Sequence, residues 1–235
     1  MDMSNEFHDL LRTTMEALTR DLAQDGAPIE QTLAEVTAAA VGLLPAVDAA
    51  DVLLIDNGVF TSVASTSPVG PRLDGAQRDT GEGPCLDAAR ATAVVRCDDL
   101  STDPRWPSFT AIAVDTGVHS MLSYQLYTHG AGSGALNLFS EKVGAFSHEA
   151  EAVGAMLATH AALALIAVNR QRQFESALAS RDLIGQAKGM IMERFNVDAV
   201  RAFDLLRLLS QNQNIPLRDV ASQIVASGPE RRDPG

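Results

Sequence analysis

The segment from Ser147 to about Phe195 constrains the fold of this chain more than any other, because it contains almost nothing that would end a helix. Gly154 is its one clear helix breaker before Gly185. Its apolar residues keep a mixed three- and four-residue spacing, which predicts one long helix. A helix that projects so far beyond its own domain needs a partner to bury its apolar stripe. We therefore expect a homodimer through the long helix, with packing back onto its own domain as the alternative.

Charge is distributed unevenly along the 235 residues, whose formal net charge is −12. The chain up to Ser180 carries ten Arg and Lys residues against 23 Asp and Glu residues, whereas the part from Arg181 onward carries eight against seven. Such acidity argues against a protein that coats nucleic acid, because that affinity depends on neutralising many phosphates. Only the C-terminal block, from Arg181 to the end, is suited to an anionic partner.

Several protein classes are disfavoured by what the sequence lacks. No apolar run approaches the roughly 20 residues of a membrane span, and the N-terminus has no charged region followed by an apolar core. Two cysteines, Cys85 and Cys97, make neither a disulfide framework nor a zinc site. No set of nucleophile, base and orienting residue stands out. We therefore expect a cytoplasmic protein that is not an enzyme, has no membrane partner and needs no cofactor or metal.

The N-terminal two thirds of the chain alternate between helical and strand periodicities. Helical spacing predicts helices over residues 4–23, where Ser4 is the expected N-cap, and over residues 29–44. Alternating residues predict strands at residues 51–56, 59–64, 93–97, 118–128 and 134–140. The Asn-Gly pair between the first two predicts a hairpin, residues 67–80 are expected to be turns, and a short helix follows Gly81. This pattern predicts an α+β fold, an antiparallel sheet flanked by helices.

Four motifs in this region resemble successive signatures of the GAF domain, a fold that senses small molecules or proteins. They are GEGPCLDA, DLSTDPRWPSF, HSMLSYQL and SGALNLFSEKVGAFS. The resemblance covers about residues 29–168 and implies a sensor domain, with Gln125 as a departure where the family pattern has proline. It implies no particular ligand, because the histidines are scattered and no pattern for haem, bilin or cyclic nucleotide is present. The sensed signal, a small molecule or a protein, therefore stays open.

A few residues of this region invite a chemical interpretation. Cys85 follows Gly-Glu-Gly-Pro near a helix N-terminus, where a thiolate would be stabilised, but a buried structural thiol is favoured for both Cys85 and Cys97. His119 begins a strand and is expected to be structural or exposed. Tyr124 and Tyr127 should lie on opposite faces of one strand by alternation, so that one of them faces the core or a pocket.

The C-terminal block is predicted to form three helices. Apolar spacing predicts the first up to Phe195, Asp198 begins the second, and Pro216 precedes the third. The stretches IGQAKGMIMERF, VRAFDLLRLLSQ and NIPLRDVASQIV resemble an ANTAR domain, the RNA-binding output module of bacterial antitermination regulators. The order of a GAF domain followed by an ANTAR domain is also a known arrangement. A unit of this size has a small core, so docking to the long helix is expected to help it fold.

The ANTAR resemblance implies which residues contact RNA. RNA loops are recognised through splayed bases and a few charged contacts, so a nearly neutral module is sufficient. The RNA-binding candidates are Lys188, Gly189, Arg207, Ser210, Gln211, Asn214 and Arg218. Lys188 would meet a phosphate, Gly189 would admit another backbone, and the others would offer donors to bases or phosphates. Phe203 is expected in the core, and Pro216 stands where related sequences carry a basic residue, which removes one phosphate contact.

Together these observations predict a signal-responsive regulator that binds RNA stem-loop leaders and causes transcription antitermination. The expected organisation is an N-terminal helix (1–28), a GAF-like domain (29–168), a helical connector (169–180), an ANTAR-like domain (181–227) and a disordered tail (228–235). Two alternatives remain open. One is a DNA-binding helix-turn-helix regulator, for which the usual turn glycine is missing, and the other is a sensor that binds a protein without nucleic acid.

Overall fold

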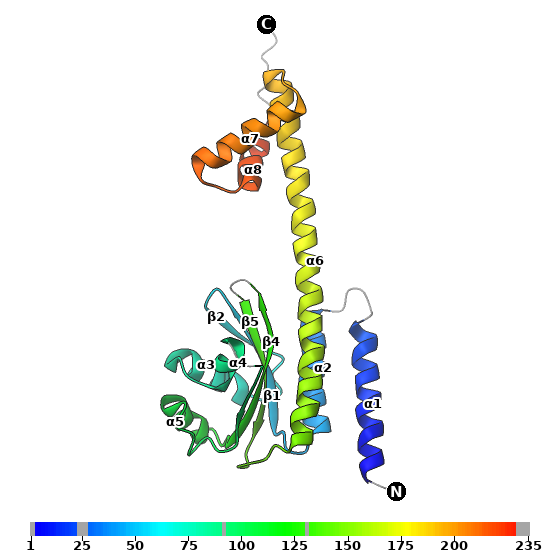
Figure 1. Cartoon of the computed structure of the whole chain (residues 1–235), viewed down its shortest axis with the longest axis vertical. Coiled ribbons are helices and arrows are strands. Elements are labelled where there is room, and N and C mark those ends of the chain that lie inside the picture. The colour runs from blue at the N-terminus through cyan, green and yellow to red at the C-terminus, as the bar shows by residue number, and fades with distance from the viewer. Residues whose placement is uncertain (1–2, 23–27, 91–92, 130–131, 229–235) are drawn as a thin grey trace. The chain divides into compact units, whose positions relative to one another are not determined.

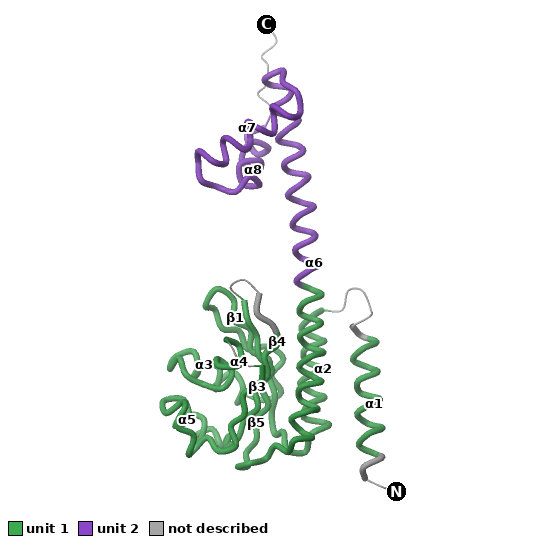
Figure 2. Tube along the Cα trace, in the orientation of Figure 1, with its two compact units in different colours: residues 1–168 green, residues 169–235 purple. Residues whose placement is uncertain are grey.

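The computed structural model describes residues 3–22, 28–90, 93–129 and 132–228 (Figure 1). The chain divides into two compact units, residues 1–168 and residues 169–235, which Figure 2 colours separately. Each unit has its own hydrophobic core, and one long helix contributes residues to both. The tail predicted for residues 228–235 falls, from residue 229 onward, outside the described residues.

Unit 1 is built around one antiparallel sheet of five strands in the order β2-β1-β5-β4-β3. The strands are β1 (Ala49–Asp56), β2 (Val59–Val63), β3 (Val94–Cys97), β4 (Ser120–His129) and β5 (Gly132–Ser140). β1 and β2 form the predicted hairpin, in which Asn57 and Gly58 have φ angles of 48° and 80°, the left-handed pair that a tight two-residue loop requires. β1 also pairs with β5 along its length, which brings the first and last strands together at the centre of the sheet.

Helices cover both faces of this sheet (Figure 1). They are α1 (Met3–Leu22), α2 (Ile29–Leu43), α3 (Val69–Thr80), α4 (Pro84–Arg90), α5 (Pro107–Asp115) and α6 (His148–Phe195). α2 and α6 cover one face, where Val52 and Leu122 are buried, and α3 to α5 cover the other face, where Leu53 and Met121 are buried. The expected α+β fold is therefore confirmed. α1 begins before Ser4, so Ser4 lies inside that helix and is not its N-cap.

Most of the segment 67–80, for which the sequence predicts turns, forms the helix α3 (Val69–Thr80). The helix ends at Gly81, whose φ of 71° suits a glycine at a helix C-terminus. Its buried face includes Leu73 but also the polar residues Asp74 and Gln77. The inward positions are therefore only partly apolar, and hydrophobic periodicity alone does not reveal this helix.

A bulge in β4 interrupts the alternation from which Tyr124 and Tyr127 are predicted to lie on opposite faces. The pairing of β4 with β5 shifts by one residue between Gln125 and Tyr127. Tyr124 pairs with Leu136 and Tyr127 with Gly134, two residues apart on β5, so simple alternation does not hold across this point. Tyr124 is buried in the core beneath α2 and α6, and the side chain of Tyr127 lies outside the described residues.

The long helix predicted from residue 147 onward is α6. Ser147 caps it, since its hydroxyl oxygen accepts a hydrogen bond of 3.1 Å from the N–H of Ala150. Gly154 has a packing role, because a Cβ at this position would stand 2.5 Å from the Tyr124 hydroxyl, which donates to the carbonyl of Glu151 at 2.9 Å. By length and composition α6 is the one described helix that could cross a membrane. Much of its apolar N-terminal part is packed in the core of unit 1, which accounts for that composition.

Unit 2 consists of three helices, the end of α6, α7 (Ala199–Gln213) and α8 (Leu217–Ser227). Its buried core residues are Ala187, Ile191, Ala202, Leu206, Val220 and Ala221. The predicted helix starts are confirmed: Asp198 caps α7 by accepting a hydrogen bond of 2.8 Å from the N–H of Arg201, and Pro216 directly precedes α8. Half of the buried side chains are alanines, so the core is as small as expected.

Candidate functional sites

Lys188 and Gly189 lie on the part of α6 that packs in unit 2. Ala187 is buried in the core, which leaves Lys188 partly exposed and Gly189 exposed. No ion pair to Lys188 is present within the described residues, so its ammonium group is available to an anion from outside. A Cβ at Gly189 would meet no other atom within 4 Å. No contact within the described part of the chain therefore requires a glycine at this position.

The two predicted arginine contacts lie in the second half of α7 (Arg207) and at the start of α8 (Arg218). Arg207 and Gln211 are four residues apart and both are exposed, so they share one face of α7. Arg207 pairs with Asp204 at 3.5 Å, and Arg218 pairs with Asp219 at 3.4 Å. Both pairs are solvent-exposed, and such pairs are weak. Each guanidinium group can therefore exchange its carboxylate for a phosphate.

Ser210 and Asn214 shape the turn between α7 and α8. The Ser210 hydroxyl donates a hydrogen bond of 2.6 Å to the carbonyl of Ile215. Asn214 adopts the left-handed conformation with a φ of 52°, and its N–H donates to the carbonyl of Gln211 at 3.3 Å. The Asn214 side chain is exposed and remains able to contact a ligand, whereas the Ser210 hydroxyl proton is already used within the turn.

A groove of about 1080 Å³ lies among the end of α6, α7 and α8, and the predicted contact residues do not line it. Its walls combine apolar side chains with Arg194 and Arg201. Phe195 and Leu208, both in the wall, are 59% and 52% exposed, and the Arg194 guanidinium lies 5.8 Å from the centre of the Phe195 ring. Large apolar side chains gathered on a surface mark a binding site. The sequence does not indicate this groove, because only packing shows which apolar residues stay outside the core.

The expectation that Phe203 lies in the core is wrong. Its side chain is 42% exposed, because Ala202 and Leu206 occupy the inward face of α7 and Phe203 is turned away from them. Leu209, which shares the predicted apolar stripe, is also 38% exposed. Unit 2 thus presents aromatic and aliphatic side chains to solvent that its small core leaves out.

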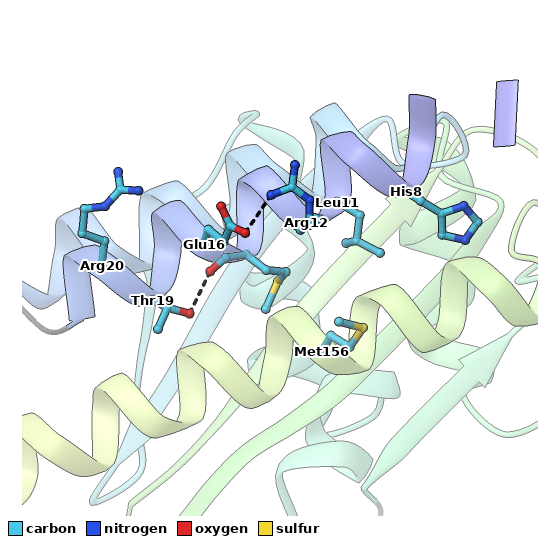
Figure 3. A pocket seen from close by; sticks show the side chains of 8 residues that line it. His8, Leu11, Arg12, Glu16, Thr19, Arg20 and Met156 are labelled. Atoms are coloured by element: carbon cyan, nitrogen blue, oxygen red, sulfur yellow. Dashed lines mark hydrogen bonds and ion pairs between the residues drawn. The ribbon is translucent and has the colours of Figure 1, made fainter. Parts of the chain in front are cut away.

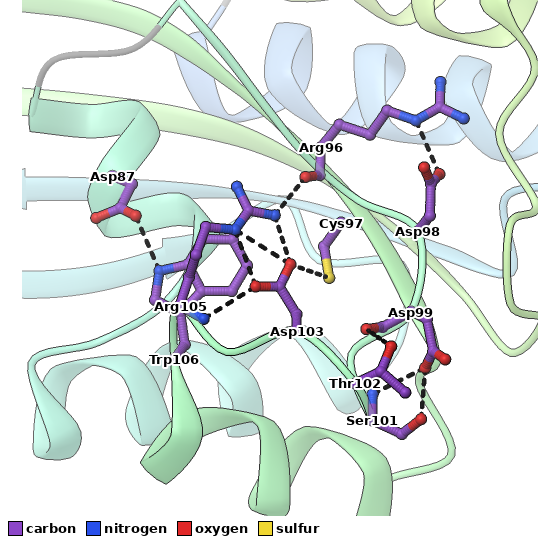
Figure 4. A network of polar contacts seen from close by, with 10 residues as sticks. All are labelled: Asp87, Arg96, Cys97, Asp98, Asp99, Ser101, Thr102, Asp103, Arg105 and Trp106. Carbon is purple, nitrogen blue, oxygen red and sulfur yellow. Dashed lines mark hydrogen bonds and ion pairs between the residues drawn. The ribbon is translucent and has the colours of Figure 1, made fainter.

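In unit 1 the DPRW segment is held by a network of polar contacts (Figure 4). Arg105 lies 4.0 Å from the centre of the Trp106 ring and donates to the Asp103 carboxylate and to the carbonyl of Arg96. The hydrogen bonds from Arg105 lower the pKa of Asp103 to about 2. The Trp106 indole N–H donates to Asp87 at 2.8 Å. These contacts fix the loop against β3 and α4, so the motif forms part of the scaffold.

Both cysteines are buried thiols. Burial raises the pKa of Cys85 well above its usual value, and the nearby charges of Asp74 and Asp51 raise it further. Burial also raises the pKa of Cys97 to about 12. Neither group is therefore an activated thiolate nucleophile. Among the described residues no group of three or more His, Cys, Asp and Glu side chains is placed to hold a metal ion.

A buried pair of carboxyl groups lies between the sheet and α3. Asp51 on β1 and Asp74 on α3 are 0% and 2% exposed. Burial raises the pKa of Asp51 well above its usual value, and the charge of Asp74 adds to this, while burial raises the pKa of Asp74 to about 6. Asn137 donates to Asp51 at 2.9 Å, and Ser62 donates to Asp74. The sequence does not indicate this pair, because the two residues are separated in the chain and meet only when α3 packs on the sheet.

Comparison with known families accounts for both units. A family model for the GAF domain matches residues 4–166, and a model for the ANTAR domain matches residues 172–225. The chain belongs to the GAF domain family and carries an ANTAR domain. Both domains are regulatory rather than catalytic, so the chain is a signal-responsive regulator with an ANTAR domain of the RNA-binding kind. No curated protein matches the chain significantly.

Solved structures share the fold of the GAF domain. The GAF domain of a phosphoenolpyruvate-protein phosphotransferase from Coxiella burnetii is 20% identical with a TM-score of 0.51, and the match covers 73% of this chain and 99% of that one. Free methionine-R-sulfoxide reductase from Neisseria meningitidis is 16% identical with a TM-score of 0.54, covering 73% and 95%. The N-acylhomoserine lactone dependent LuxR family transcription factor CepR2 from Burkholderia cenocepacia is 16% identical with a TM-score of 0.52, covering 67% and 93%. Identities this low establish the fold alone.

Proposed function

We propose that this chain is a cytoplasmic, dimeric regulator whose ANTAR domain binds RNA stem-loops and causes transcription antitermination, while its GAF domain senses a small molecule or a protein. The observation that carries the proposal is the ANTAR domain at residues 172–225, whose surface combines exposed cations with exposed aromatic and apolar side chains. RNA loops are bound through this combination. Bases that leave the stack meet aromatic or guanidinium planes, and phosphates meet cations.

The ANTAR domain offers two kinds of contact for such an RNA. The groove, with the Phe195 ring and the Arg194 and Arg201 guanidinium groups in its walls, suits an unstacked base. The seven residues predicted from the sequence supply phosphate and base-edge contacts outside the groove. Because few cations are involved, we expect the affinity to depend only modestly on salt.

An exposed apolar stripe along α6 supports the dimer. Its members are Met156, Leu163, Ile166, Phe174 and Leu178, each at least 37% exposed. On an ideal helix these positions fall within about one third of the circumference. A groove of about 770 Å³ between α1 and α6, lined in part by Leu11 and Met156, extends this apolar surface (Figure 3). A second copy of α6 would cover the stripe, as paired long helices do.

A dimer also suits the proposed RNA target. Two ANTAR domains joined through α6 can engage two hairpins of one RNA, and the second contact is then strengthened by effective concentration. Holding both hairpins would prevent the same RNA segment from pairing into a terminator.

The RNA-binding proposal is tested with a gel-shift assay on two-hairpin RNA leaders. We expect binding that Lys188→Ala weakens and whose salt dependence falls by about one phosphate contact. Lys142→Ala is the matched control, because Lys142 is the other lysine of the chain and lies in the GAF domain. Binding to duplex DNA but to none of these RNAs would replace the proposal with the helix-turn-helix alternative, in which Asn214 would stand in for the turn glycine.

Dimerisation is tested separately by measuring the mass in solution with light scattering. We expect the wild-type chain to be a dimer, and the double variant Leu163→Gln, Phe174→Gln to shift toward monomer because two apolar contacts of the seam are lost. Arg172→Gln is the control, since Arg172 is exposed on the other side of α6. A monomeric wild-type chain would contradict the dimer.

A further inference from the structure

The middle of α6 is a length of helix that belongs to neither hydrophobic core. On this helix the buried cluster of the GAF domain ends at Leu165, and the cluster of the ANTAR domain begins with Leu183. Between these two points every residue from 170 to 179 is exposed. All of them lie in unit 2, so this stretch of helix can be considered by itself.

Two large apolar side chains stand on this uncovered stretch. Phe174 and Leu178 are 61% and 45% exposed, and as residues four apart they share one face of the helix. Arg172 and Ser176, which are also exposed, fall on the opposite face. Large apolar groups gathered on one face of an otherwise polar helix indicate that a partner covers that face.

Charged residues of opposite sign flank the apolar face on its two edges. On an ideal helix Arg170 and Arg181 lie about 20° to 40° to one side of Phe174. Glu175 and Asp182 lie about 80° to 100° to its other side. One edge of the face is therefore basic and the other edge is acidic.

The basic edge has no acidic neighbour along its own helix. No Asp or Glu stands three or four residues from Arg170 or Arg181, the spacings at which helical side chains meet. Within the described part of the chain no ion pair to either arginine is present. On the acidic edge, Glu175 accepts a hydrogen bond of 2.7 Å from Gln171. These arginines can thus take a carboxylate partner from another molecule.

A second copy of the same stretch complements both edges when the two helices run in the same direction. Two-fold symmetry then places the basic edge of each helix against the acidic edge of the other. Arg170 and Glu175 are five residues apart, which is the spacing between a g position and the next e position of a heptad. Residues at g and e form the salt bridges of parallel coiled coils. An antiparallel pair would instead place basic edge against basic edge and acidic edge against acidic edge.

We propose that two copies of α6 pair in parallel, with Phe174 and Leu178 against their own counterparts and Arg170 of each copy against Glu175 of the other. This inference rests on the proposed dimer and names its direction and its contacts. A parallel pair holds both ANTAR domains at the same end of the paired helices. Two hairpins that are close together in one RNA are then within reach of both domains.

Charge reversal tests the pairing between the helices. Arg170→Glu and Glu175→Arg each create two like-charged pairs, and we expect each to raise the dissociation constant of the dimer about five- to thirtyfold by sedimentation equilibrium. The double variant exchanges the two charges and should return to within about threefold of the wild-type value. Positions five residues apart lie about 140° apart around one helix, so this rescue cannot arise within one chain. Arg172→Glu is the matched control on the opposite face and should have less than about a twofold effect.

Cross-linking through engineered cysteines tests the direction of the helices. Gln171→Cys and Leu178→Cys, each made alone, change positions about 10 Å apart along α6. In a parallel pair each position lies opposite its own counterpart, so both variants should form an intermolecular disulfide on oxidation. In an antiparallel pair only a position at the two-fold axis meets its counterpart, so at most one variant can. The wild-type chain is the control, because Cys85 and Cys97 are buried.

The results distinguish the direction of the helices from the dimer itself. A monomeric wild-type chain would contradict both. A dimer that the double charge reversal does not restore, or that cross-links at one position only, would contradict the parallel pairing and leave the dimer intact. If Arg170→Glu weakened RNA binding in the gel shift without changing the dissociation constant, Arg170 would be an RNA contact and the proposed pairing would be wrong.

Discussion

The two domains depart from ordinary folding in opposite directions. The GAF domain buries polar groups, with Asp51, Asn137 and Ser123 fully inside, whereas the ANTAR domain leaves Phe195 and Leu208 more than half exposed. Folding alone favours the reverse in both cases, because buried polar groups and exposed large apolar groups are each unfavourable. The GAF domain thus has a polar interior beside its sheet, whereas the ANTAR domain has an open apolar groove on its surface.

The size of the two cores explains why the GAF domain can bury polar groups and why the ANTAR domain leaves apolar groups exposed. The GAF domain has two large apolar clusters, one on each face of its sheet, which can offset a few buried polar groups. The ANTAR core contains six buried residues, half of them alanines, and cannot enclose every apolar side chain of its helices. A small core therefore leaves apolar residues on the surface, where a ligand can use them.

The largest expected effect concerns the buried acids of the GAF domain. Burial raises the pKa of Asp74 from 3.8 to about 6. A carboxyl group with a raised pKa binds its proton more tightly in the folded state, so its stabilising contribution is complete below about pH 4 and is lost as the pH rises through about 6. A shift of about two units corresponds to roughly 3 kcal/mol in the free energy of unfolding. Urea unfolding at a series of pH values measures this loss.

Asp74→Asn cannot titrate, so the fall in stability across this pH range should be smaller in that variant. Asp115→Asn removes a carboxyl group that is 76% exposed and serves as the control. Equal pH dependence in the wild-type chain and Asp74→Asn would show that the acid pair is not strained, and the contrast between the domains would lose its main support.

The next prediction concerns the close packing of α6 against Tyr124, which we expect to require a glycine at position 154. Gly154→Ala would push a Cβ to 2.5 Å from the Tyr124 hydroxyl, and we expect a loss of about 2 kcal/mol in the free energy of unfolding from overpacking. Gly185→Ala is the matched control on the same helix, because a Cβ there meets nothing within 4 Å. That variant should gain up to about 1 kcal/mol from helix propensity. A similar change in both variants, measured by urea unfolding, would contradict the packing role.

A smaller effect is expected for the apolar groove of the ANTAR domain. Phe195→Ser should weaken RNA binding about tenfold, because a stacked base contributes about 1 to 3 kcal/mol. Its effect on stability should be small, since the side chain is 59% exposed. Val200→Ser is the control, because Val200 is 73% exposed and does not line the groove. The measurement is a binding titration by fluorescence anisotropy. If both variants bind RNA equally well, the groove is not a base site.

The smallest expected effect concerns local stability of the ANTAR domain. Asp198→Ala removes the cap that accepts from the Arg201 N–H and should destabilise α7 by about 1 kcal/mol. Asp204→Ala, a change within the same helix, leaves the cap intact. Faster amide hydrogen exchange in α7 of Asp198→Ala, with unchanged exchange in the GAF sheet, would show that the two domains unfold separately. Slower or unchanged exchange in α7 would contradict the cap.

Features that depend on residues close together in the chain could be predicted from the sequence. The Asn57-Gly58 hairpin, the length of α6, and the caps at Ser147 and Asp198 follow from turn chemistry, helical spacing and capping within a few residues. The two families were recognisable for the same reason, since their motifs are short and stand in order. The seven RNA contacts read from those motifs remain predictions.

Features that depend on residues far apart in the chain could be seen only in the folded structure. α3 is a helix with buried polar residues, and the bulge in β4 overrides simple alternation. Phe203 is exposed because Ala202 and Leu206 occupy the side of α7 that faces the core. Asp51, Asn137 and Ser123 are buried neighbours because β1, β5 and β4 pair with one another. Burial is a property of the packed chain, so no local pattern could show which polar groups it would enclose or which apolar groups it would leave in water.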